Sequence, residues 1–137
     1  MVGGLKRLFL LLLLVALLYS VLSTEGILRI EKYFREEHRD LIYTPKICYL
    51  LGNIAYLTYR NELAIDIMSR NLQDFPYESA AMKTELRRAY CYERDGNCGK
   101  AIQLYEKFLI RHPKHKRYEL IQNRIVKLQT SEHAHAH

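Results

Sequence analysis

Tryptophan is absent from this chain, and its 137 residues include only three cysteines. No two cysteines have the Cys-x-x-Cys spacing, which excludes the attachment motif of a c-type haem, and none lies near the apolar N-terminus, which excludes a lipoprotein anchor. A glycine-rich phosphate loop, an HExxH zinc motif and a nucleophile elbow are also missing. The carboxylates are scattered over predicted helix surfaces, with no cleft to pair them. We therefore predict a protein that is not an enzyme and that uses no cofactor.

A run without charge extends over residues 8–22. Its fifteen residues span about 22 Å as a helix, less than the roughly 30 Å hydrocarbon core, but Leu5 and the two cations that follow it extend the reach. A cleaved signal peptide and a retained signal anchor both fit this pattern. The high leucine content and the lack of a helix breaker before Gly26 favour an anchor over residues 1–26.

Lys6 and Arg7 predict the orientation of this segment. Positive charges beside a membrane helix stay on the cytoplasmic side, so the chain after Thr24 is expected to be exported. The prediction is a single-pass protein that contacts the membrane through residues 5–24. Its remaining part is expected on the periplasmic or another extracytoplasmic side.

Charge is unevenly divided along the rest of the chain. Residues 24–79 carry 7 basic and 9 acidic side chains, whereas residues 80–130 carry 12 basic and 5 acidic. The basic residues are spread around predicted helix faces, and signatures of nucleic-acid readout are absent, so no nucleic-acid partner is predicted. We interpret the basic half as a solvated surface; contact with an acidic partner or an anionic lipid is the other interpretation.

Residues 82–115 have the pattern of two helices joined by a polar turn at residues 94–97. After the turn, apolar side chains recur at i, i+3, i+4, i+7 and i+8, which is one face of a helix that a proline ends. Six residues match, in order and spacing, the signature of a known repeat: Ala89, Tyr92, Ala101, Tyr105, Phe108 and Pro113. The segment thus resembles a tetratricopeptide repeat, a helix-turn-helix unit of about 34 residues.

A shift of 37 residues aligns an earlier segment with this one. The shift matches three signature positions: Pro76 with Pro113, Ala64 with Ala101 and Gly52 with Ala89. Two departures weaken the earlier copy, because Ala55 stands in place of Tyr92 and Asn71 in place of Phe108.

Together these patterns predict an all-α fold. An N-terminal transmembrane helix is followed by a short tetratricopeptide-like α-solenoid of two helical hairpins and a capping helix. The predicted segments are an amphipathic connecting helix over 27–43, a domain over 44–130 with repeats over about 45–78 and 82–115 and a cap over 116–130, and a histidine-rich tail over 131–137. The predicted N-caps are Thr44, with Pro45 at the first helical position after it, then Asn61, Ser79 and Asn97.

In the tetratricopeptide family, the first helix of each hairpin lines a groove that receives peptides. Carried over by position, the resemblance implies a partner-binding groove formed by Lys46, Tyr49, Asn53, Tyr56, Lys83, Leu86, Tyr90 and Glu93. Tyrosine rings with polar groups at their edge suit a segment of another protein. The alternative is that the chain's own segment 27–43 covers part of this face.

The cysteines and the tail leave two further questions open. Cys91 and Cys98 flank the predicted turn, so in an exported chain they could form a disulfide, or both could stay reduced. His133, His135 and His137 alternate in the tail and are candidate ligands for a divalent metal, but no metal function is predicted for them.

These expectations lead to one functional hypothesis. The chain is expected to be a membrane-anchored protein that mediates protein–protein interaction, as an adaptor, an assembly factor or a small accessory subunit of a larger membrane or envelope complex. Its partners would be subunits of that complex. The alternative is a cleaved, soluble exported carrier or chaperone-like factor.

Overall fold

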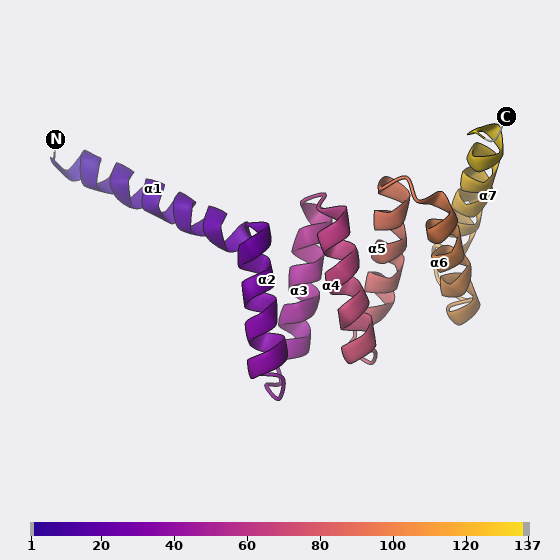
Figure 1. The fold of residues 1–137 in the computed structure, drawn as a ribbon, viewed down its shortest axis with the longest axis horizontal. Coiled ribbons are helices and arrows are strands. Elements are labelled where there is room, and N and C mark those ends of the chain that lie inside the picture. The colour runs from indigo at the N-terminus through magenta and orange to yellow at the C-terminus, as the bar shows by residue number, and fades with distance from the viewer. Residues whose placement is uncertain (1, 136–137) are drawn as a thin grey trace. The chain divides into compact units, whose positions relative to one another are not determined.

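The structure is a computed structural model that describes the backbone of residues 2–135 and the side chains of residues 3–131. Every regular element within these residues is a helix, which confirms the all-α prediction (Figure 1). The chain divides into two units, residues 1–44 and residues 45–137.

The first unit contains α1 (Val2–Leu22), α2 (Thr24–Lys32) and a π-helical segment, η1 (Tyr33–Glu37). Within α1, the 20 residues of Gly3–Leu22 are long and apolar enough to cross a membrane. At 1.5 Å per residue they span about 30 Å, because the helix begins before the uncharged run does. A signal sequence has the same length and composition, so both interpretations of this segment stay open.

Ser23 separates α1 from α2, so the connecting segment does not simply continue the apolar helix. Its backbone is extended, with ψ at 158°, and its Oγ accepts a hydrogen bond from the Gly26 N–H at 3.0 Å, which caps α2. A Cβ on Gly26 would lie 2.2 Å from the Ser20 carbonyl oxygen. Glycine therefore allows the two helices to approach closely at this bend.

The helical part of the connecting segment ends at Glu37, six residues before the predicted end at Tyr43. Residues 38–43 form turns instead. The hydroxyl of Thr44 donates a hydrogen bond to the His38 carbonyl at 2.5 Å, and the Thr44 N–H donates to the Leu41 carbonyl at 3.0 Å. Through these two bonds, Thr44 closes the turn formed by residues 38–43.

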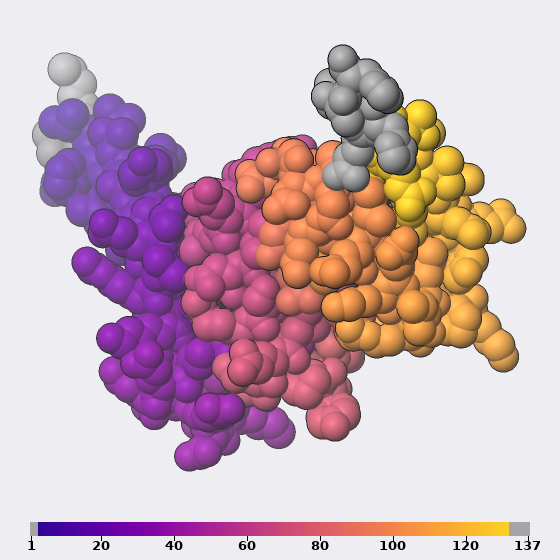
Figure 2. Space-filling view, turned by 45° about the vertical axis from the view of Figure 1, so that its right-hand side comes forward, coloured from indigo at the N-terminus to yellow at the C-terminus, as the bar shows by residue number. Residues whose placement is uncertain are grey.

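The second unit consists of α3 (Thr44–Leu57), α4 (Asn61–Asp74), α5 (Ala81–Arg94), α6 (Cys98–Arg111) and α7 (Tyr118–His135). Each boundary of α5 and α6 lies 37 residues after the matching boundary of α3 and α4, so the internal repeat seen in the sequence is a repeat of structure. The helices follow one another side by side in chain order (Figure 1), and the space-filling view shows them as one continuous packed body (Figure 2). Connections of three or six residues favour antiparallel neighbours.

One core cluster of buried residues joins α5, α6 and α7. Tyr105 is fully buried and Phe108 is 2% exposed, as the apolar stripe predicted, and Ile121 and Ile125 of α7 pack against them. Burying one such large side chain stabilises the fold by about 1.5–3 kcal/mol. The terminal helix thus covers the second hairpin, although it continues to His135, beyond the predicted end of the cap at residue 130.

Of the four predicted caps, Asn97 is confirmed, and Thr44 is the first residue of α3. The Asn97 side chain accepts a hydrogen bond from the Lys100 N–H and caps α6. The predictions for Asn61 and Ser79 are wrong, because α4 and α5 are preceded by Arg60 and Ala80, whose side chains make no cap hydrogen bond. Asn61 instead lies inside α4 as its first residue.

Candidate protein-interaction face

Side chains seven residues apart lie on the same side of a helix, so α3 and α5 each present one row to a common surface, called here the α3–α5 face. The structure distributes the eight predicted groove residues over three adjoining hollows of this face. The first hollow, of about 310 Å³, is lined by Lys46, Tyr49, Asn53 and Lys83. The second, of about 470 Å³, is lined by Tyr56, Tyr90 and Glu93. The third, of about 320 Å³, is lined by Leu86 and again by Lys83.

Tyr49 is mainly a structural residue of this face. It is 5% exposed, and its hydroxyl donates hydrogen bonds to the carbonyls of Phe75 at 2.9 Å and Asn71 at 3.2 Å. These bonds tie α3 to the end of α4. Leu86 is likewise buried, at 6% exposure, and belongs to the core cluster. Two of the eight predicted contact residues therefore offer little surface to a partner.

Arg87 connects the row of side chains on α5 with the row on α3. It is not among the groove residues predicted from the family resemblance. Its Nη1 donates a hydrogen bond to the Asn53 side-chain oxygen, and its guanidinium lies 5.1 Å from the centre of the Tyr56 ring. A cation over an aromatic face is attracted by the quadrupole of the ring. The signal was present in the sequence as an arginine one position after Leu86, but a family-derived groove pattern does not include that position.

Arg94 holds the far end of the same surface. Its guanidinium lies 4.4 Å from the centre of the Tyr56 ring and 4.8 Å from that of Tyr59, and both Nη atoms donate to the Tyr56 carbonyl at 3.2 Å. Tyr56 thus contacts two arginines, Arg87 and Arg94. These contacts fix both guanidinium groups against aromatic rings before any ligand arrives.

Glu93 is neutralised within the fold. Arg124 of α7 donates through Nε to both carboxylate oxygens, at 2.7 and 2.9 Å, and the Tyr105 hydroxyl donates to the same carboxylate at 2.6 Å. Burial of the Tyr105 hydroxyl, reinforced by its bond to Glu93, raises the pKa of that tyrosine far above its usual value. Arg124 also lies 4.9 Å from the centre of the Tyr90 ring. Glu93 therefore orients a cation and contributes little free negative charge.

The balance of charge on the three hollows is positive. Among the described side chains, only two carboxylates line the hollows, those of Glu78 and Glu93. The cations that line them are Lys46, Lys83, Arg87, Arg94, Lys116, Arg117 and Arg124. Positively charged hollows with tyrosine walls favour a ligand that combines acidic and apolar groups.

The cysteines are free thiols in the structure. Cys48 and Cys91 are fully buried, whereas Cys98 at the start of α6 is partly exposed. Arg94 donates a hydrogen bond to the Cys91 sulfur at 3.4 Å, and burial raises the pKa of that thiol. The predicted alternative of a Cys91–Cys98 disulfide is thus not formed here.

The candidate metal ligands of the tail cannot be placed by the structure. His137 and the side chains of His133 and His135 lie outside the described residues. Among the residues that are described, no group of three or more metal-ligating side chains is suitable for an ion.

No protein-family model matches this chain, and no curated protein matches its sequence.

Proposed function

We propose that this chain is a membrane-anchored, tetratricopeptide-like protein that binds a segment of a partner protein on its α3–α5 face. It serves as an adaptor, an assembly factor or a small accessory subunit of a larger membrane complex, and its role is binding rather than catalysis. The observation that carries the proposal is the contact of two guanidinium groups with one ring, since those of Arg87 and Arg94 lie 5.1 and 4.4 Å from the centre of the Tyr56 ring. Such ordered side chains lose little conformational freedom when a ligand binds.

The chemistry of the face specifies the partner segment. Lys46 and Lys83 are exposed and line the first hollow together with Arg87, which also contacts the Tyr56 ring. A segment with carboxylates and an apolar or aromatic side chain matches this arrangement, because its charges meet the cations while its apolar group packs on tyrosine.

Site-specific photocrosslinking in native membranes tests the proposal. A benzophenone amino acid replaces Lys46 on the α3–α5 face, or Lys107 on the exposed side of α6 as a matched control. A partner should crosslink at position 46 and not at position 107. The double charge reversal Lys46→Glu with Lys83→Glu should abolish copurification of that partner, whereas Lys100→Glu with Lys107→Glu should not. Equal crosslinking at both positions, or equal copurification with both double variants, would reject the α3–α5 face as the binding surface.

The alternative of a cleaved, soluble exported carrier rests on the N-terminal location of α1, which a signal sequence shares. The intact mass of the purified chain separates the two proposals. A mass that includes residues 1–23 supports the anchored protein, and a mass that lacks them supports the carrier.

A further inference from the structure

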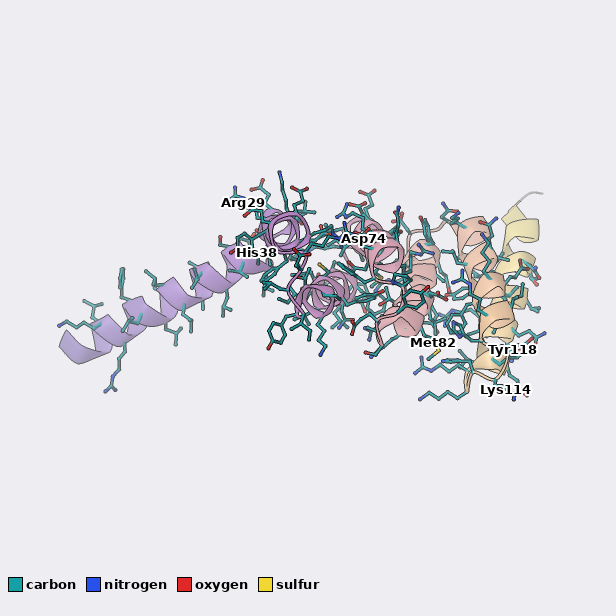
Figure 3. All side chains as sticks on the ribbon, turned by 90° about the horizontal axis from the view of Figure 1, so that it is seen from below. Arg29, His38, Asp74, Met82, Lys114 and Tyr118 are labelled. Carbon is teal, nitrogen blue, oxygen red and sulfur yellow. The ribbon has the colours of Figure 1, made fainter. Side chains whose placement is uncertain are left out.

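The loop between α6 and α7 carries a concentration of positive charge, of which only part, Lys116 and Arg117, also lines the hollows of the α3–α5 face. Residues 111–117 include six basic side chains in seven positions, interrupted only by Pro113. Together with Met82 of α5, most of them line a shallow hollow of about 540 Å³, and Figure 3 labels two of its residues, Met82 and Lys114.

The loop has a defined shape because two of its histidines pack on the core. The rings of His112 and His115 lie 4.6 and 5.1 Å from the ring of Phe108, which is buried. His112 Nε2 is also 3.4 Å from a carboxylate oxygen of Glu85, and Arg111 pairs with the other oxygen at 2.5 Å. The Tyr118 N–H donates to the His115 carbonyl at 2.9 Å, which joins the loop to the start of α7.

Three cations remain available after these contacts. Lys114, Lys116 and Arg117 are exposed, and within the described part of the chain no acidic side chain pairs with them. Met82 is 43% exposed at the edge of the same hollow. The hollow therefore presents free positive charge beside an apolar side chain.

The fold does not require these charges, as the internal repeat demonstrates. The matching connection between α4 and α5, residues 75–80, has the same length and the same proline at its second position. It contains one acidic residue, Glu78, and no basic one. The basic side chains at residues 112–117 are therefore additional to what closes the turn.

We propose that the α6–α7 loop binds the headgroup of an anionic phospholipid in the bilayer in which α1 is anchored. The proposal rests on the proposed membrane anchor. Lys116 and Arg117 are shared with the α3–α5 face, but the first hollow, which holds Lys46, contains no residue of this loop. Cations attract an anionic membrane surface, each strengthening binding roughly fivefold, and a tether to the same bilayer raises the effective lipid concentration. Met82 supplies an apolar contact at the boundary between headgroups and acyl chains, and the hollow has the volume of a small-ligand site.

Hydrogen–deuterium exchange of the full chain in lipid nanodiscs tests the proposal. Nanodiscs of phosphatidylcholine alone are compared with nanodiscs that also contain phosphatidylglycerol. The backbone N–H groups of residues 112 and 114–117 should exchange roughly tenfold more slowly with the anionic lipid. Those of residues 75 and 77–80 should not change, and they serve as the reference within the same molecule. Slowing should disappear at high salt, since the screening length falls from about 10 Å at 0.1 M to about 3 Å at 1 M.

A loop variant tests the role of the charges. Lys114→Tyr, Lys116→Ser and Arg117→Ala together introduce the residues found at the matching positions of the other loop, so the turn should still form. This variant should lose the slowing, whereas the control Lys100→Ser with Lys107→Ala on α6 should keep it. Equal exchange in the two nanodiscs for the wild-type chain would overturn the proposal whatever the variant does.

Soluble anions distinguish the source of the negative charge. Inorganic phosphate or polyglutamate is added to the chain in phosphatidylcholine nanodiscs. Slowing by phosphate as strong as that by phosphatidylglycerol would reassign the loop to small anions, and slowing by polyglutamate alone would reassign it to a protein partner. Both results would overturn the lipid assignment while leaving the crosslinking test of the α3–α5 face unaffected.

Discussion

Tyr59 and Gly96 occupy the same position in two successive turns, and both have a left-handed backbone, with φ at 58° and 78°. The surrounding hydrogen bonds also repeat. The Arg60 N–H donates to the Ala55 carbonyl at 3.0 Å, and 37 residues later the Asn97 N–H donates to the Tyr92 carbonyl at 2.9 Å. This geometry closes the C-terminus of a helix with a residue at positive φ, where glycine is favoured.

Adding a Cβ at position 96 should lower the stability of the protein, whereas removing the Cβ at position 59 should raise it. A left-handed conformation costs a residue with a Cβ about 1–2 kcal/mol, so Gly96→Ala should destabilise the protein by about 1 kcal/mol. Tyr59→Gly removes the strain but also the ring beside Arg94, whereas Tyr59→Ala removes only the ring. Tyr59→Gly should therefore be about 1 kcal/mol more stable than Tyr59→Ala in thermal unfolding followed by circular dichroism. Equal stability of these two variants would contradict the proposed strain.

Asn71 illustrates what a repeat alignment predicts poorly. Because Asn71 aligns with Phe108, the repeat pattern predicts that a packing residue is missing here. Asn71 is nevertheless completely buried, and its Nδ2 donates a hydrogen bond to the Cys48 carbonyl at 2.8 Å. Close packing explains the choice of residue. A Cβ on Gly52 would lie 3.3 Å from Asn71 Nδ2, from Ile67 and from Met68. A compact amide fits here, whereas Phe108 lies opposite Ala89 in a space shared with α7.

Asn71 should therefore be more sensitive to enlargement than to a change of polarity. Asn71→Phe, which introduces the residue of the other repeat, should destabilise the protein by more than Asn71→Ala, for which we expect a loss of about 2 kcal/mol. The combination of Asn71→Phe with Gly52→Ala should be worse still, because both add atoms to the same contact. Free energies of urea unfolding measure the three effects. A Phe variant as stable as the wild-type chain would show that the crossing can relax.

The sequence predicted helices better than it predicted side-chain partners. Three signals in the sequence located all four helices of the repeat: the spacing of apolar residues, the turn residues and the shift of 37 residues. The bend at Ser23 and the end of the helix at Glu37 depend on hydrogen bonds donated by the Gly26 N–H and by the Thr44 hydroxyl, which periodicity does not reveal. The groove residues were placed on the correct helices, but the roles of Arg87 and Arg94 depend on rings that lie more than 30 positions away in the chain.

Thiol reactivity should distinguish the three cysteines. Cys98 is partly exposed, whereas Cys48 and Cys91 are buried and burial raises the pKa of Cys91, so less of its reactive thiolate form is present at neutral pH. The folded chain should take up one equivalent of a maleimide rapidly and two more only after denaturation. Mass spectrometry of the labelled peptides identifies the residue, and Cys98→Ser is the control that should abolish rapid labelling. No labelling of the folded chain, followed by uptake of a single equivalent at Cys48 after denaturation without reduction, would instead indicate a Cys91–Cys98 disulfide.

Tyr105 should make the stability of the protein sensitive to alkaline pH. Its hydroxyl is buried and bonded to Glu93, so its pKa is raised in the folded state, whereas in the unfolded chain a tyrosine ionises near pH 10. Below that pH both states hold the proton and the stabilisation is complete. As the pH rises further, the unfolded chain ionises first and the free energy of unfolding falls. At pH about 11 the loss should be about 1.4 kcal/mol relative to neutral pH.

The Tyr105→Phe variant should lack this alkaline loss of stability. At neutral pH its free energy of unfolding should be about 1 kcal/mol lower than that of the wild-type chain, because the hydrogen bond to Glu93 is missing. Urea unfolding of both proteins at neutral and alkaline pH measures the difference in slope. Tyr77→Phe is the matched control, because Tyr77 is 99% exposed and its substitution should change neither the stability nor the slope. If the wild-type and Tyr105→Phe proteins lost equal stability at alkaline pH, the tyrosine would ionise as readily in the folded chain as in the unfolded one. The bond to Glu93 could then not hold α6 against α5 through a retained proton.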